Sequence, residues 1–146
     1  MSATRQAVRQ LIAELRCDII LPLKYGDFFD QQGEIPARSG DNRRHPRFYF
    51  RTKVGINLFN LTCDRPEQFE QATYIKDLSR SGLAFVHNSR LEPGEIVRLL
   101  LPNGTIRNVS VLRSKQVSFD CFEVAGEFIK DASIRPNAAV RNGTPS

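Results

Sequence analysis

Apolar residues near the start of the chain are spaced as on one face of a helix. This pattern predicts an amphipathic helix over residues 3–19, in an N-terminal unit of residues 1–21. The apolar stripe must be buried against the protein's own β region, against a second copy, or against a different protein. The residues that form the stripe are Val8, Leu11, Ile12, Leu15 and Ile19.

Residues 22–42 follow, where glycine and proline recur and no apolar period is kept, so we predict an irregular linker. Phe28 and Phe29 are the exceptions, and we expect these two rings to anchor the linker. The linker leads directly into an arginine-rich segment, which we expect to lie on a mobile arm.

From Phe48 to Lys130 the alternation is that of β-strands, beginning with a long strand over 48–61 that has a bulge near Gly55. Asn103-Gly104 is a strong hairpin signal. Short strands, tight turns and no interior helix favour an antiparallel barrel or a sandwich. The small and polar residues 131–146 predict a disordered C-terminal tail. The other expected strands are 73–76, 82–87, 96–101, 105–113 and 119–129.

The chain has 146 residues, enough for one soluble domain with extensions, and a net charge of +5. Residues 38–53 hold six basic groups and one acidic group, so this window carries the whole net charge. A local basic patch on a neutral body favours a compact anionic partner over a long polyanion. The alternative is a solvated basic turn.

The chain has three cysteines, an odd number with no closely spaced pair, and two histidines. This composition argues against a disulfide framework and a metal site. No nucleophile–base pair is recognisable, so we predict neither an enzyme nor a bound cofactor. We interpret Cys63 and Cys121 as small core residues, and His87 as a surface or packing residue. The start of the chain lacks an apolar signal core and no run could span a bilayer, so we expect a cytoplasmic protein.

Two short motifs carry the candidate chemistry. Arg43-Arg44-His45-Pro46-Arg47 contains an Arg-x-x-x-Arg, and Asp77-Leu78-Ser79-Arg80-Ser81-Gly82 is an Asp-x-Ser-x-x-Gly. Arginine can donate two parallel hydrogen bonds to guanine O6 and N7 or to a phosphate. The second motif can answer polar ligand edges, or it can be a turn in which Asp77 and Ser79 satisfy backbone amides. In either case we expect Gly82 to permit a backbone conformation or a close approach that a Cβ would obstruct.

These motifs, followed by Val124–Phe128 as a glycine-and-aromatic closing strand, resemble the PilZ domain family of bacterial cyclic di-GMP receptors over residues 41–130. The resemblance implies a mostly β, six-stranded antiparallel barrel over residues 43–130. It also implies a ligand site for cyclic di-GMP and a downstream protein partner. The residues that it assigns to the site are Arg43, Arg44, Arg47, Asp77, Ser79 and Gly82.

On this interpretation the ligand orders an arm of residues 38–47 across the barrel, and a partner protein detects the change. Arg113 lies outside both motifs, and we expect its replacement to leave binding unchanged. One alternative is a PilZ-like adaptor that has lost nucleotide binding, although no motif residue is missing. A nucleic-acid-binding barrel is less favoured because no aromatic-rich basic strand is present. The chain can be a monomer or a homodimer.

Overall fold

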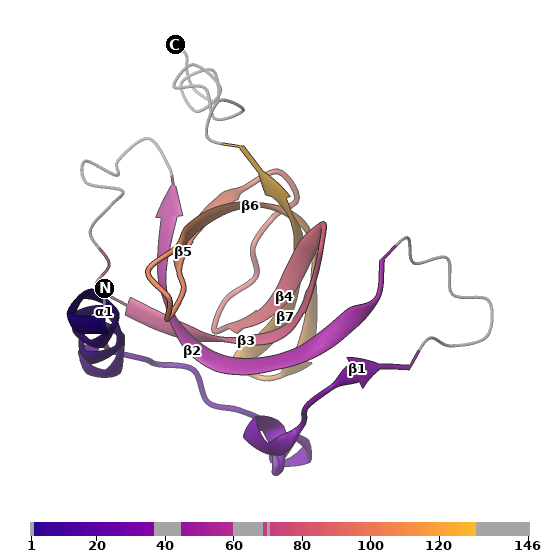
Figure 1. The fold of residues 1–146 in the computed structure, drawn as a ribbon. Helices are drawn as coiled ribbons and strands as arrows, with labels where there is room; N and C mark the ends of the chain where they lie inside the picture. The colour runs from indigo at the N-terminus through magenta and orange to yellow at the C-terminus, as the bar shows by residue number, and fades with distance from the viewer. Residues whose placement is uncertain (1, 37–44, 60–68, 70, 131–146) are drawn as a thin grey trace.

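A closed antiparallel barrel is the centre of the computed structural model, which describes residues 2–36, 45–59, 69 and 71–130 (Figure 1). The strands follow the order β2-β3-β4-β7-β6-β5, and a pairing of β2 with β5 closes the ring. The predicted six-stranded antiparallel barrel is therefore confirmed, while the predicted tail lies outside the described residues. The barrel strands are β2 (Arg47–Phe59), β3 (Gln71–Ser79), β4 (Gly82–His87), β5 (Ile96–Leu100), β6 (Ile106–Ser118) and β7 (Cys121–Ile129).

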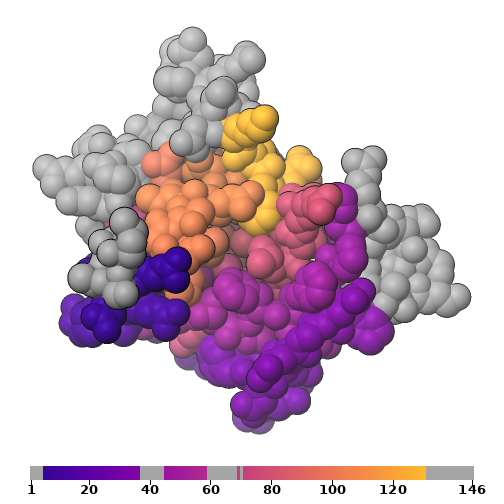
Figure 2. Space-filling view, viewed as in Figure 1, coloured from indigo at the N-terminus to yellow at the C-terminus, as the bar shows by residue number. Residues whose placement is uncertain are grey.

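The interior of the barrel is filled by alternate side chains from all six strands. Val54, Phe85, Leu99, Val109 and Val124 are completely removed from solvent. The ring that looks open in the ribbon is packed with side chains in the space-filling view (Figure 2). Burial on this scale is the main stabilising contribution to the fold. Cys121 is buried as expected, and Cys63 lies outside the described residues.

One predicted bulge and one predicted strand end are wrong in ways that affect the site. The register of β2 and β3 shifts between Tyr49 and Thr52, so the bulge lies there, while Gly55 pairs regularly with Ala72. Strand β3 continues to Ser79 and does not end at Lys76. Asp77 therefore lies within a strand, because it pairs with Tyr49 on one side and Ala84 on the other.

Helix α1 (Ser2–Glu14) buries its apolar stripe on the outside of the barrel, beside β2 and β5 (Figure 1). Ile12 and Leu15 pack with Ala72 and Leu100, which confirms burial on the protein's own β region. Gly55 makes room for this contact, since a Cβ there would lie 3.2 Å from a methyl of Leu15.

The helix ends before residue 19 because the following backbone pairs with β3. Arg16 forms a parallel bridge with Gln71, and the Ala72 amide donates to the Arg16 carbonyl at 2.7 Å. The amine of Lys53 donates to the Ala13 carbonyl at 3.1 Å, which supplies a partner and a positive charge at the helix C-terminus. No helix among the described residues is long and apolar enough to cross a bilayer.

The predicted irregular linker is ordered over its described part. It forms two short 3₁₀ turns, η1 (Leu23–Tyr25) and η2 (Phe28–Asp30), and a short strand, β1 (Glu34–Ile35), which pairs with the start of β2. Phe28 is buried, as expected for an anchor, and Phe29 packs edge-on against Tyr74.

Arg51 explains why the linker is held against the barrel. Its guanidinium donates to the Phe28 carbonyl at 3.2 Å and to the Lys76 carbonyl at 2.7 Å. It also lies 4.2 Å from the centre of the Phe28 ring, a cation–π contact. One arginine thus ties the linker to the strand that carries the second motif.

His87 is a buried packing residue at the end of β4. Its Nδ1 lies 3.1 Å from the Ser89 carbonyl and 3.3 Å from the Ser89 amide. Burial lowers the pKa of His87, while its hydrogen bond to Ser89 opposes that effect. The folded protein therefore holds His87 neutral more strongly than the unfolded chain does.

We expect His87 to make the fold less stable in mild acid. The folded pKa is depressed, so the unfolded chain binds more protons below its own pKa of about 6.5, and stability falls as the pH drops. The slope attributable to His87 can reach at most about 1.4 kcal/mol per pH unit, between the unfolded pKa and the lower folded pKa, and it disappears below the folded pKa. Urea denaturation of wild type and His87→Asn at pH 7 and pH 5 measures it; parallel pH dependences would contradict this assignment.

Candidate functional site

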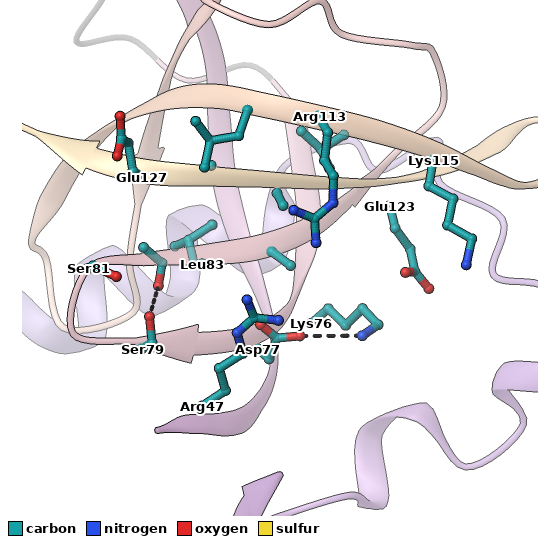
Figure 3. A pocket seen from close by; sticks show the side chains of 16 residues that line it. Arg47, Lys76, Asp77, Ser79, Ser81, Leu83, Arg113, Lys115, Glu123 and Glu127 are labelled. Carbon is teal, nitrogen blue, oxygen red and sulfur yellow. Dashed lines mark hydrogen bonds and ion pairs between the residues drawn. The ribbon is translucent and has the colours of Figure 1, made fainter. Parts of the chain in front are cut away.

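A groove of about 300 Å³ lies on the barrel surface where the two sequence motifs meet (Figure 3). Arg47, Asp77, Ser79 and Gly82 line it, which are four of the six predicted site residues. Arg43 and Arg44 lie outside the described residues. The remaining walls come from β3, β4, β6 and β7, through Lys76, Ser81, Leu83, Ala84, Leu112, Arg113, Lys115, Glu123, Val124, Ala125, Gly126 and Glu127.

The pairing of β2 with β3 brings the two motifs together. Arg47 is opposite Ser79 in the ladder, and Tyr49 is opposite Asp77, although 30 positions separate Arg47 from Asp77 in the sequence. Facing residues of antiparallel strands have Cβ atoms about 5 Å apart. Arg47 is exposed and points into the groove (Figure 3).

Asp77 is nearly buried in the groove, with 7% of its surface exposed. Its Oδ2 accepts a hydrogen bond from the Lys76 amine at 3.3 Å. Because Asp77 lies inside a strand, the alternative of a turn residue that satisfies backbone amides does not describe it. Asp77 is an acidic side chain held at a groove wall, in contact with the amine of Lys76.

Ser79 does have a structural role at the turn between β3 and β4. Its hydroxyl donates to the Gly82 carbonyl at 3.3 Å, across the residues that reverse the chain. The Ser81 carbonyl in turn accepts from the Phe128 amide at 2.9 Å, which ties the turn to β7. The Ser79 hydroxyl thus acts in the turn by donating to a carbonyl, not by satisfying a backbone amide as the turn alternative supposed, and Ser79 also lines the groove.

Gly82 serves close backbone packing. A Cβ on Gly82 would lie 2.1 Å from the carbonyl oxygen of Gly126, which no real contact allows. Gly126 is itself crowded, because a Cβ there would lie 2.4 Å from a methyl of Val109. The described glycines with positive φ do not include Gly82, so the expected special backbone conformation does not apply, and the crowding at Gly82 comes from the backbone of β7.

Charges alternate around the groove. The cations are Arg47, Lys76, Arg113 and Lys115, and the acids are Asp77, Glu123 and Glu127. The described walls thus carry a small positive excess. A compact dianion would gain only part of its binding energy from them.

Sequence reasoning missed the contribution of strand β6. Arg113 points into the groove from the side opposite to Arg47 (Figure 3), so the expectation that it is remote from binding loses its basis. Lys115 is paired with Glu123 across β6 and β7. The only signal for either residue is the strand pairing, which the sequence does not reveal.

Glu123 is an acid in a place where burial works against its charge. Burial raises the pKa of Glu123, and the nearby Lys24 partly opposes the shift.

Arg51, by contrast, does not line the groove. Its guanidinium is occupied by the two carbonyls described above, and burial lowers the pKa of Arg51.

A family model for the PilZ domain matches residues 41–130, more than half of the chain. The protein therefore belongs to the PilZ family, a family of cyclic di-GMP receptors whose members are binding or adaptor domains rather than enzymes. No curated protein matches the chain.

We expect Gly82→Ala to destabilise the barrel by at least roughly 1–3 kcal/mol, the range typical of overpacking. The reason is that the new methyl group meets the fixed backbone of β7. Thermal unfolding followed by circular dichroism measures the effect. The matched control is Gly26→Ala, where a Cβ would make one ordinary contact at 3.6 Å with the Leu23 carbonyl. Equal melting temperatures for the two variants would show that the strands can separate without cost.

Proposed function

We propose that this protein is a cyclic di-GMP receptor that binds its ligand in the groove between the two motifs and signals to a protein partner. The observation that carries the proposal is the register of β2 and β3, which sets Arg47 opposite Ser79 and two pairs away from Asp77. An arginine, a carboxylate and a hydroxyl then converge on one groove with further basic groups on its far wall.

Each residue type has a defined task in this proposal. Arg47 forks onto a phosphate or onto the O6 and N7 edge of a guanine. Asp77 accepts from the guanine N1 and N2 groups, while Lys76 holds its Oδ2 by a hydrogen bond. Ser79 can contribute a hydroxyl to a phosphate or base, and Gly82 keeps the groove floor free of a side chain.

The near balance of charge in the groove makes Arg43 and Arg44 necessary for tight binding. Four cations face three acids among the described lining residues, whereas the ligand brings two phosphates. Two further guanidinium groups would supply the missing positive charge and the planar surfaces for stacking on guanine. The contribution expected of Arg43 and Arg44 follows from their charge and side-chain type, which the sequence of the motif gives.

The described flanks also refine the proposed ordering of the arm. Ile35 pairs with Arg47, so the segment between them begins and ends at the same point of the sheet. A loop closed at both ends has already lost part of its conformational entropy, which lowers the cost of ordering it on a ligand. Because Arg51 fixes the preceding linker, a partner would bind the ordered segment at a defined position.

Calorimetric titration with cyclic di-GMP tests the proposal directly. We expect saturable binding to wild type, and a loss of about 5- to 150-fold in affinity for each of Arg43→Ala and Arg47→Ala. Arg5→Ala, which removes an exposed arginine of helix α1, is the control and should bind like wild type. Absence of binding to wild type would favour the adaptor that does not bind nucleotide, and equal losses in all three variants would indicate nonspecific attraction.

We expect Glu123→Gln to strengthen cyclic di-GMP binding about fivefold at pH 7, because it removes a carboxylate from the groove that receives the phosphates. The pKa of Glu123 is raised, so its carboxyl group becomes protonated at a higher pH than usual. The advantage of the variant should therefore shrink as the pH falls from 7 to 5. Identical affinities at pH 7 would place the phosphates away from β7.

A further inference from the structure

A second and larger groove, of about 670 Å³, lies between helix α1 and the end of the barrel. Its volume is within the range of sites that bury a ligand, and its lining is mainly apolar. The apolar floor comes from Ile12 on the helix and from Phe50, Leu78, Leu101 and Pro102 on the barrel.

The helix forms one wall of this groove without filling it. Ile12 and Leu15 pack mainly with Ala72 and Leu100 on the neighbouring face of the sheet, so Ile12, only 4% exposed, offers no more than an edge to the groove. Phe50, Leu78 and Leu101 remain only half-buried. The protein thus keeps a half-exposed apolar surface beside a helix, a geometry that proteins use to bind an additional helix.

The rim of the groove is basic. Arg9 and Lys53 line it, and none of its described lining residues is acidic. Arg5 lies one turn before Arg9 on the same side of the helix, so the positive charge continues past the groove. An occupant with an apolar stripe and acidic flanks complements both features.

Charge also argues against two occupants from this chain, helix α1 of a second copy and residues 131–146. Helix α1 of a second copy would bring Arg5 and Arg9 against the basic rim, with Glu14 as its one acid. Residues 131–146 contain two arginines and one aspartate, so they would be repelled as well. A partner of opposite charge fits better than either.

We propose that this groove docks an acidic amphipathic helix of a partner protein. It is separate from the nucleotide groove but shares strand β3 with it, since Leu78 lines one and the adjacent Asp77 lines the other. Successive residues of a strand face opposite sides of the sheet. The docking site does not depend on nucleotide binding and is tested without nucleotide.

The probe is a fluorescein-labelled synthetic helix of about 15 residues, long enough to be partly helical, with leucine at i, i+3, i+4 and i+7 and glutamate on the flanks. A matched peptide carries lysine in place of glutamate. Fluorescence anisotropy with the full chain should show saturable binding of the acidic peptide and at least about tenfold weaker binding of the basic one.

Ala13 offers a variant that fills the groove without touching the core, because it lines the groove and is exposed on the helix. Ala13→Trp should lower the affinity for the acidic peptide at least about tenfold. Ala7→Trp is the control, an exposed position on the same helix that does not line the groove. Arg9→Glu should weaken the peptide about fivefold, and Lys24→Glu, at the linker, should not.

Four results would overturn the proposal. The acidic peptide could fail to bind, or the two peptides could bind equally, which would indicate apolar adsorption only. Ala13→Trp and Ala7→Trp could bind alike, which would place the peptide elsewhere. A wild-type chain that sediments as a dimer, together with a monomeric Ala13→Trp variant, would assign the groove to a second copy of this chain.

Discussion

The close approach of three strands at Gly82 and Gly126 is the constraint on which the rest of the structure depends. A Cβ on Gly82 would meet the backbone of β7 at 2.1 Å, so β4 and β7 can lie this close only with glycine there. The same contact fixes the β3–β4 turn, whose Ser79 hydroxyl binds the Gly82 carbonyl. A glycine of the ligand motif therefore acts first through barrel closure, and the shape of the groove follows from that closure.

Strand β2 carries the connections between the site and the N-terminal elements. It pairs with β1, β3 and β5, so it joins the linker, the strand that carries Asp77 and Ser79, and the closing strand of the barrel. Arg51 on β2 holds the Phe28 and Lys76 carbonyls, and Lys53 holds the end of helix α1. A shift of β2 at the arginine motif would thus displace the contacts that hold the linker and helix α1. In the proposed function, this arrangement would connect a nucleotide bound at the arginine motif to the N-terminal elements.

The two grooves divide recognition between polar and apolar chemistry. The smaller one mixes arginine, lysine and carboxylates, and the larger one has an apolar floor and a basic rim. Asp77 and Leu78 are neighbours in β3 but face different grooves, because side chains alternate along a strand. A receptor needs one surface for its signal and another for its output. The protein has a chemically suitable surface for each, on opposite sides of a single strand.

The sequence by itself determined the elements whose signals are local. Period-two alternation predicted the strands and helical spacing predicted α1, while the family resemblance carried by the two motifs implied that Arg47 and Asp77 share a site. Tertiary structure decided what depends on pairing. The helix ends at Glu14 because Arg16 pairs with Gln71, and Asp77 is in a strand because Tyr49 and Ala84 flank it. Arg113 enters the groove, and β2 closes on β5 to give a barrel where the alternation also allowed a sandwich, because contacts between distant segments leave no periodic mark in a single chain.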